Sequence, residues 1–291
     1  MKYLFMAISI TLATLQSVIL KKFSNKTIKN TGDLFFFNGA VSVVWTAIML
    51  VWFILSGDGF MSLPTIIFGL VYGLILCSFL YFKTASLAEG SVTITTLIGS
   101  SAFVPATIFG LFYANESAST FQIIGMSLML LAVAVCINYK KSEQKPTFKW
   151  AIYTALFFIA GSALGAFFKV FGGSNCFDQV NGMMLSASIF SAVFFFATGV
   201  VINKSTMQPI PTIAKPSLIY VLGSGVAGCL YVRFNLSLSA IINSAIFFPV
   251  SNGSIVMLST LAGFMLFKEK LTRWQILGIA LGIIAIVLSS F

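Results

Sequence analysis

Pro249, Ser251 and Asn252 stand together inside a long apolar stretch of the sequence. Proline lacks a backbone donor and clashes with the preceding helical turn, and Gly253 weakens a helix further, so backbone carbonyls can become free here. A broken helix with an amide side chain beside it is a plausible substrate-binding site. A structural kink in which Asn252 bonds a neighbouring helix is the other interpretation, and the sequence favours neither.

A second polar patch contains Thr96 and Ser100, with Pro105 shortly after them. An offset of 153 residues places Ser100 on Gly253, so the two patches correspond if the chain contains a repeat of that length. Two such patches that face each other would form a neutral, hydrogen-bonding pocket.

Four further residues are candidates for contact with a substrate. Arg233 lies within an apolar run, a few residues before its end, where an ionised group is costly unless it is useful. Its guanidinium could hold a carboxylate or phosphate bidentately, or it could extend to the membrane interface. Tyr81 falls on Arg233 at an offset of 152, and Thr14 and Asn38 offer polar groups in the first two apolar runs. Threonine often bonds its own helix backbone, which is the alternative role for Thr14.

The remaining charged residues near apolar runs are expected to serve the structure. Lys83 and Lys169 lie near the ends of their runs, where a lysine normally extends to the interface. Glu116 and Glu269 lie where a loop meets the next run, a position typical of helix capping.

Several kinds of chemistry are missing from the sequence. It contains no histidine, its four cysteines form no CxxC pair, and its seven acidic residues all fall in or beside loops. Histidine-based metal sites, general bases and proton relays are therefore excluded, and no nucleophile with a base is visible. We expect neither an enzyme nor a bound metal or cofactor. Without a buried carboxylate, the chain has no obvious group for exchanging protons against cations.

The composition identifies the class of protein that must position these residues. Of 291 residues 58% are hydrophobic and only 8% are charged, and the mean hydropathy is +1.02. A helix needs about 20 apolar residues to cross about 30 Å of hydrocarbon. Continuous runs of that length favour a helical bundle over a β-barrel. The ten runs cover residues 3–20, 34–55, 65–85, 92–113, 121–139, 150–171, 183–202, 217–236, 241–267 and 274–291.

The chain reads as two copies of one five-helix unit. A polar connector at 140–147 separates residues 1–139 from residues 148–291, and coincidences at offsets of 147 to 153 relate the two parts. Five is an odd number, so the second copy must enter the membrane from the opposite side. The sequence thus predicts an all-α polytopic membrane protein of ten transmembrane helices in two inverted repeats, with a substrate site near the midplane.

The basic residues predict the orientation of the chain in the membrane. Lysine and arginine accumulate in cytoplasmic loops, and 14 of the 17 follow the odd-numbered runs. This distribution places both termini outside. The formal net charge of +10 does not indicate nucleic-acid binding, because the basic residues are spread over short loops rather than gathered on one face.

The chain resembles the ten-helix drug/metabolite transporter (DMT) superfamily of the EamA type over nearly its whole length. The resemblance rests on Phe82-Lys-Thr-Ala-Ser-Leu, Glu116, Phe121-Gln-Ile-Ile-Gly125 and Phe267-Lys-Glu-Lys-Leu-Thr-Arg-Trp-Gln-Ile-Leu-Gly278. It implies a secondary transporter or facilitator of metabolites, amino acids or drugs in the cytoplasmic membrane, with cytoplasmic termini. Small multidrug-resistance proteins, which Leu20-Lys-Lys-Phe-Ser24 resembles, carry a membrane-embedded glutamate where this chain has Thr14.

The sequence therefore favours a transporter of a small neutral, zwitterionic or anionic metabolite, for example an amino acid, that works by alternating access. The alternative within transport is a multidrug exporter with an aromatic pocket. A non-transporting membrane subunit or scaffold is the alternative of another class. The expected partners are a small-molecule substrate and the lipid bilayer, and the sequence indicates no oligomeric state.

Overall fold

The structure is a computed structural model that describes residues 2–27, 31–57, 60–136, 147–205, 215–267 and 272–289. Within these ranges the chain forms eleven α-helices and one short 3₁₀ helix, and no strand. The helices are α1 (Lys2–Thr27), α2 (Thr31–Ser56), α3 (Leu63–Glu89), α4 (Val92–Ser100), α5 (Phe103–Tyr113), α6 (Thr120–Cys136), α7 (Phe148–Gly172), η1 (Phe177–Gln179), α8 (Val180–Ser205), α9 (Lys215–Ile241), α10 (Ser244–Phe267) and α11 (Arg273–Ser289).

The helices have the length and surface of membrane spans. Seven spans in the described residues are long and apolar enough to cross a bilayer, and Phe103–Tyr113, Thr120–Ala132 and Arg273–Leu288 are shorter apolar helices. Large apolar side chains also cover the outside of the bundle, as Leu55 and Phe112 illustrate with 79% and 82% exposure. Such a surface suits lipid rather than water. The prediction of an all-helical, multi-pass membrane protein is confirmed.

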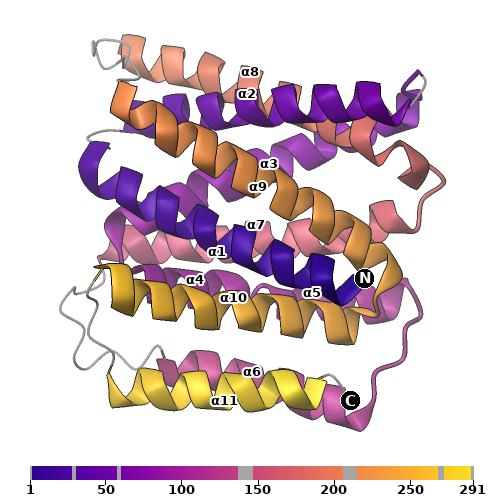
Figure 1. The fold of residues 1–291 in the computed structure, drawn as a ribbon, viewed down its shortest axis with the longest axis vertical. Coiled ribbons are helices and arrows are strands. Elements are labelled where there is room, and N and C mark those ends of the chain that lie inside the picture. The colour runs from indigo at the N-terminus through magenta and orange to yellow at the C-terminus, as the bar shows by residue number, and fades with distance from the viewer. Residues whose placement is uncertain are drawn as a thin grey trace.

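Figure 1 shows the helices side by side, with α2 and α8 at one edge of the bundle and α6 and α11 at the other. Between these edges α1 packs on α9 and α3 on α7, while α5 packs on α7 and α1 on α10. The N- and C-termini lie at the same end of the bundle. We call this the terminal end and the other the opposite end.

The fourth apolar run, expected as one helix over 92–113, is divided into α4 and α5. The amides of Ser101 and Ala102 bond carbonyls three residues back, which tightens the chain into a turn. Pro105 explains the position of the break, because its ring would clash with the carbonyl four residues earlier in a continuous helix. Pro105 is tolerated in the first turn of α5, where backbone donors have no helical partner.

At Pro249 the sequence left a broken helix and a structural kink equally open, and the structure has no break there, since α10 continues through this residue. Pro249 is the sixth residue of α10, so only one helical hydrogen bond is lost to the missing donor. The amide of Asn252 donates to the carbonyl of Phe248 within the same helix, at 2.9 Å. Through this bond the Asn252 side chain stays on its own helix rather than bonding a neighbouring one.

Two helix boundaries also differ from the expectation. α1 continues to Thr27 and α9 to Ile241, so Arg233 lies about two turns from the end of its helix rather than a few residues from it. Of the predicted connector 140–147, only Thr147 belongs to the described residues, and its hydroxyl accepts from the amide of Trp150 at 3.1 Å as the N-cap of α7. Threonine is a common residue at this position.

Glycines allow the closest approaches between helices. A Cβ on Gly69 would lie 2.8 Å from the backbone carbonyl oxygen of Met183, so α3 meets α8 there without space for a side chain. A Cβ on Gly161 would lie 3.1 Å from that of Ala102, where α7 meets the break between α4 and α5. Small residues play this role in membrane bundles generally.

Candidate functional site

A cavity of about 90 Å³ lies in the middle of the bundle, between helices from both halves of the chain. Helices α1, α3, α4 and α5 contribute from the first half, and α7, α9 and α10 from the second. Its polar lining consists of Ser17, Lys83, Thr95, Thr96, Tyr231, Asn235, Ser251 and Asn252. No acidic residue belongs to this lining, as far as the chain is described.

Aromatic rings make up much of the remaining wall. The lining includes Phe79, Phe103, Phe157, Phe168, Phe247 and Phe248. Phe79 and Phe157 face each other from α3 and α7, with ring centroids 5.0 Å apart. Gly99 makes the approach of α7 possible, because a Cβ there would overlap the ring of Phe157. The cavity thus combines apolar flat surfaces with a limited number of hydrogen-bonding groups, as small-molecule sites generally do.

Lys83 is the charged residue of the cavity. The sequence predicted that its side chain extends to the membrane interface, and the structure corrects this prediction. The side chain is buried, with the ammonium 2.7 Å from the Oε1 atom of Gln16. The ammonium also lies 5.8 Å from the centroid of the Phe79 ring, within range of a cation–π interaction. Gln16 is itself buried in α1. Lys83 thereby keeps a partner on α1 while it lines the cavity.

Asn235 occupies the corresponding place in the second half. The offset of 152 that relates Tyr81 to Arg233 also relates Lys83 to Asn235 and Phe79 to Tyr231. Asn235 accepts a hydrogen bond from Ser9 on α1 at 3.1 Å, just as Lys83 donates to Gln16 on α1. Sequence reasoning missed Lys83, Asn235 and Tyr231, although the offset it used was enough to relate them.

Three of the predicted site residues line the cavity, namely Thr96, Ser251 and Asn252. Ser251 and Thr96 are buried, and Asn252 is partly exposed. Pro249 is on the same helix as Asn252 but is not part of the lining. The side chain of Ser100 lies outside the described residues.

The other four predicted residues lie elsewhere and have structural partners. Arg233 donates from Nε to the Oδ1 atom of Asn181 at 2.9 Å, donates to Ser237, and lies 5.3 Å from the ring centroid of Trp52. Tyr81 packs against Phe35, with centroids 4.9 Å apart. Thr14 donates to the carbonyl of Ile10, which is on the same helix, at 3.0 Å. Asn38 accepts from Thr84 at 3.2 Å, away from the cavity.

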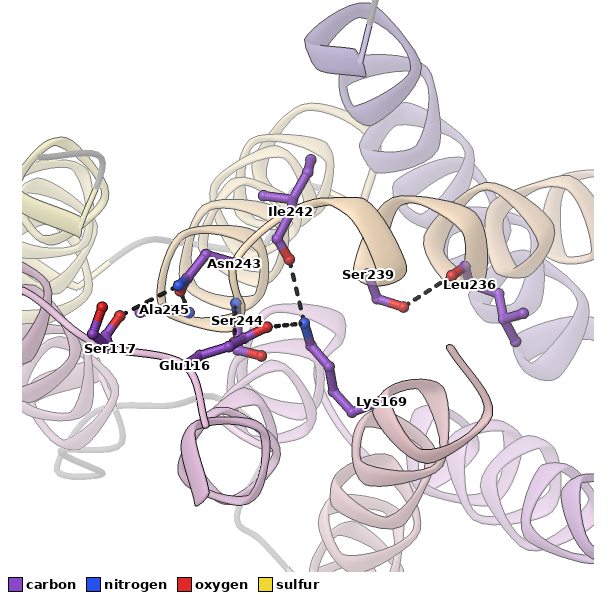
Figure 2. Close-up of polar contacts among 9 residues, drawn as sticks. All are labelled: Glu116, Ser117, Lys169, Leu236, Ser239, Ile242, Asn243, Ser244 and Ala245. Atoms are coloured by element: carbon purple, nitrogen blue, oxygen red, sulfur yellow. Dashed lines mark hydrogen bonds and ion pairs between the residues drawn. The ribbon is translucent and has the colours of Figure 1, made fainter. Parts of the chain in front are cut away.

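The Glu116 cluster, made of Glu116, Lys169, Ile242, Asn243 and Ser244, joins three parts of the chain at the terminal end (Figure 2). One oxygen of the Glu116 carboxylate pairs with the Lys169 ammonium at 2.8 Å, and the other accepts from the amide of Ser244 at 2.8 Å. Lys169 also donates to the carbonyl of Ile242 at 3.3 Å. The cluster therefore ties the loop after α5 to α7 and to the corner between α9 and α10.

Opposing effects act on the pKa of Glu116. Partial burial raises it, while the hydrogen bonds from Lys169 and Ser244 lower it, and the second effect prevails, so the pKa lies below its usual value of 4.5. The N-terminus of α10 contributes favourable partial charge to this carboxylate. Glu116 is therefore ionised at neutral pH, and the ion pair with Lys169 is formed.

Related contacts hold the opposite end of the bundle. Lys21 donates to the carbonyls of Leu87, at 3.0 Å, and Gly90, where α3 ends. Gly90 and Ile242 are 152 residues apart in the sequence. Lys21 donates to the carbonyl of Gly90 after the end of α3, and Lys169 donates to the carbonyl of Ile242 after the end of α9. The indole of Trp150 donates to Thr95 at 3.0 Å and ties the first turn of α7 to α4.

The chain is similar to a curated protein and to several solved structures. No protein-family model matches the chain. It is 27% identical over 219 residues to the probable glucose uptake protein GlcU of Staphylococcus aureus (strain MRSA252), a match that covers 72% of this chain and 70% of that protein. A chain described as "Crystal structure of protein" matches with a TM-score of 0.68 at 14% identity, over 99% of this chain and 98% of that one. The latter similarity shows the fold alone.

Proposed function

We propose that the chain is a secondary transporter of a small polyhydroxy metabolite such as a hexose, and that the central cavity is its substrate site. The observation that carries the proposal is one cavity lined from both halves by hydrogen-bonding groups and flat aromatic rings. Sugars combine hydroxyls with apolar ring faces, so both kinds of lining have a use. The name of the GlcU relative independently supports uptake of a sugar.

An uncharged substrate fits the cavity better than the amino acid considered from the sequence. An amino acid carries an ammonium group, which needs a carboxylate or several free carbonyls when it leaves water. The described lining offers no carboxylate, and its one charged group, Lys83, would repel a second ammonium. Hydroxyl groups, in contrast, both donate to and accept from Asn235, Asn252 and the serine and threonine side chains.

The proposed architecture is ten membrane passes in two inverted five-helix repeats. In it α4 and α5 together form the fourth pass, and α7 to α11 repeat α1 to α6. In such a repeat α1 corresponds to α7, α3 to α9, and α5 to part of α10. The contact of α1 with α9 then corresponds to that of α7 with α3, and the contact of α5 with α7 corresponds to that of α10 with α1. All four contacts are present. The matched lysine contacts at the ends of α3 and α9 support the same relation. Membership of the EamA-type DMT superfamily is part of this proposal.

Alternating access would break the contacts at one end of the cavity while those at the other persist. The Glu116 cluster is a suitable closure at the terminal end, because it joins the loop after α5, α7 and the α9–α10 corner. The Trp150–Thr95 bond and the Lys21 contacts are suitable closures at the opposite end. Inverted repeats give the two ends equivalent elements, which makes such an exchange symmetrical.

Uptake by proteoliposomes tests the proposal directly. The full-length protein is purified, reconstituted and supplied with radiolabelled D-glucose, and protein-free liposomes serve as the control. We expect saturable uptake that unlabelled glucose suppresses. Uptake of ethidium without uptake of any sugar would contradict the proposal and favour the multidrug exporter. Uptake of no solute at all would favour a scaffold.

A further inference from the structure

We infer that Lys83 recognises the substrate by donating hydrogen bonds to neighbouring hydroxyl groups, and that Gln16 holds its ammonium in place for this task. The inference rests on the proposed function and specifies it, because it assigns the contact that distinguishes a polyol from other small solutes. The sequence pointed to an interfacial role for Lys83, and nothing in the names of the similar proteins assigns it another.

The position of Lys83 is unusual for a lysine in a membrane helix. It lies six residues before Glu89, the last residue of α3, or about 9 Å along the helix axis. A lysine at this depth normally extends along the helix towards the interface, which saves most of its desolvation cost. Here only 6% of the residue is exposed, and the ammonium lies against the cavity instead. A costly arrangement of this kind indicates a use.

The Lys83 ammonium has more N–H donors than hydrogen-bond partners among the described residues. A lysine carries three N–H donors, and among the described residues Lys83 has a single hydrogen-bond partner, the Oε1 atom of Gln16 at 2.7 Å. Because Lys83 lines the cavity, the other two donors are available to a ligand there. Two donors on one nitrogen suit two hydroxyls on adjacent carbons, because the oxygens of such a pair are close enough to share one cation. Phe79, 5.8 Å from the ammonium, supplies an apolar face beside it.

The surroundings favour a neutral polyol over an anion. The Gln16 carbonyl oxygen and the face of the Phe79 ring both offset the positive charge of Lys83 before any substrate arrives. Carboxylates and phosphates are commonly held by a planar arginine fork, and Arg233 is bound to Asn181 and Ser237 outside the cavity. One cation with compensating partners therefore acts here as a hydrogen-bond donor rather than as half of an ion pair.

The test measures glucose uptake into proteoliposomes by wild-type protein, Lys83→Met, Lys83→Gln and the matched control Lys204→Met. Lys204 is an exposed lysine in the last turn of α8, a helix that contributes no residue to the cavity lining. Loss of charge-assisted hydrogen bonds should raise the KM of Lys83→Met by about 10- to 100-fold. The Vmax of Lys83→Met should change by less than about threefold. The KM of Lys83→Gln should lie between those of the wild type and Lys83→Met, and Lys204→Met should have the KM and Vmax of the wild type.

Monodeoxy glucose analogues separate recognition from a structural role. In the wild type, the analogue that lacks a hydroxyl held by Lys83 should have a KM several-fold above that of glucose. In Lys83→Met this difference should vanish, while analogues modified elsewhere keep theirs. A variant that is only distorted would weaken all analogues alike, and that result would overturn the inference. Gel filtration and melting temperature establish that each variant folds, and Lys83→Gln serves if Lys83→Met does not.

The outcomes for the inference and for the proposed function are distinct. If the wild type transports glucose and Lys83→Met has an unchanged KM, the inference fails and the function stands. If gluconate inhibits wild-type uptake more strongly than glucose and loses that advantage in Lys83→Met, the residue binds an anion and the inference fails. If the wild type transports no sugar, the function fails; sugar-induced thermal stabilisation that persists in Lys83→Met would then overturn the inference as well.

Discussion

Two asparagines expected to contact substrate lie in different surroundings. Asn252 lines the cavity and is partly exposed there, whereas Asn38 is buried between α2 and α3 with Thr84 as its partner. A side chain in the cavity can change its bonding when substrate enters. A side chain packed between helices acts on stability instead, since its truncation removes a buried hydrogen bond and leaves a cavity.

Asn252→Ala should therefore reduce glucose uptake through KM, by about 5- to 30-fold, with little change in melting temperature. Asn38→Ala should lower the melting temperature and leave the KM of the remaining folded protein near the wild-type value. Uptake kinetics and melting curves of the two variants, measured on the same preparations, test both expectations. Equal changes of KM in the two variants would show that the cavity is not the site.

At the scale of helices, the contact between α3 and α8 depends on the absence of one side chain. A Cβ on Gly69 would lie 2.8 Å from a backbone oxygen of Met183, and a backbone atom cannot move aside as a flexible side chain can. Gly282 of α11 is a matched position, because a Cβ there would have Met129 Sδ as its nearest neighbour, at 3.9 Å.

Gly69→Ala should destabilise the protein by roughly 1–3 kcal/mol, the usual cost of overpacking. Gly282→Ala should be neutral or slightly stabilising, since alanine favours a helix over glycine. Melting temperatures in detergent, with light scattering to detect aggregation, measure the difference. A neutral Gly69→Ala would mean that α3 and α8 separate easily.

The Glu116 cluster connects the loop after α5, helix α7 and the corner between α9 and α10, so its loss should lower the stability of the bundle. Glu116→Gln removes the charge, and we expect destabilisation of roughly 1–3 kcal/mol at pH 7, because Lys169 is left buried without its ion-pair partner. The pKa of Glu116 is lowered on folding, so its contribution to stability is present at neutral pH. That contribution declines below about pH 4.5, as the carboxylate becomes protonated.

Melting temperatures of wild type and Glu116→Gln at pH 7 and near pH 3 test this sign. The gap between the two proteins should be wide at pH 7 and narrow in acid. Ser117→Ala is a suitable control, because the neighbouring Ser117 is exposed and contributes only its backbone carbonyl to Asn243. A gap that is constant with pH would show that the ion pair adds nothing to stability.

Across the molecule, most basic residues follow helices that end at one end of the bundle. The termini and the end of α5 lie at the terminal end, and the end of α8 lies at the opposite end (Figure 1). Ser117 is in the loop that follows α5, and Lys204 is in the last turn of α8. Most basic residues follow the helices that finish at the opposite end. From the positive-inside rule we predict that the opposite end faces the cytoplasm.

Single cysteines at Ser117 and Lys204 test this orientation, in a chain whose Cys136 and Cys176 are replaced by serine. A membrane-impermeant maleimide added to intact cells should label Ser117→Cys at once and Lys204→Cys only after permeabilisation. The two native cysteines that remain, Cys77 and Cys229, are buried and should not react. The reverse labelling would support cytoplasmic termini, as the EamA resemblance implies.

Composition and hydrophobic run length were sufficient to determine the class of fold and most of its spans. Long apolar helices in a bilayer follow from local properties, because lipid requires every backbone group to bond within its own segment. The offset of 153 residues placed Ser100 on Gly253, and Thr96 and Ser251, which lie near these two positions, both line the cavity.

Only the tertiary structure decided which polar side chains share the cavity. Lys83 and Arg233 both read as charged residues near helix ends, yet one lies against the cavity and the other is bound to Asn181 beside Trp52. The direction of a side chain depends on which neighbouring helix offers a partner, and that depends on packing between segments far apart in the chain. The break after Ser100 had a local cause in Pro105, whereas the continuity of α10 through Pro249 depended on where that helix begins.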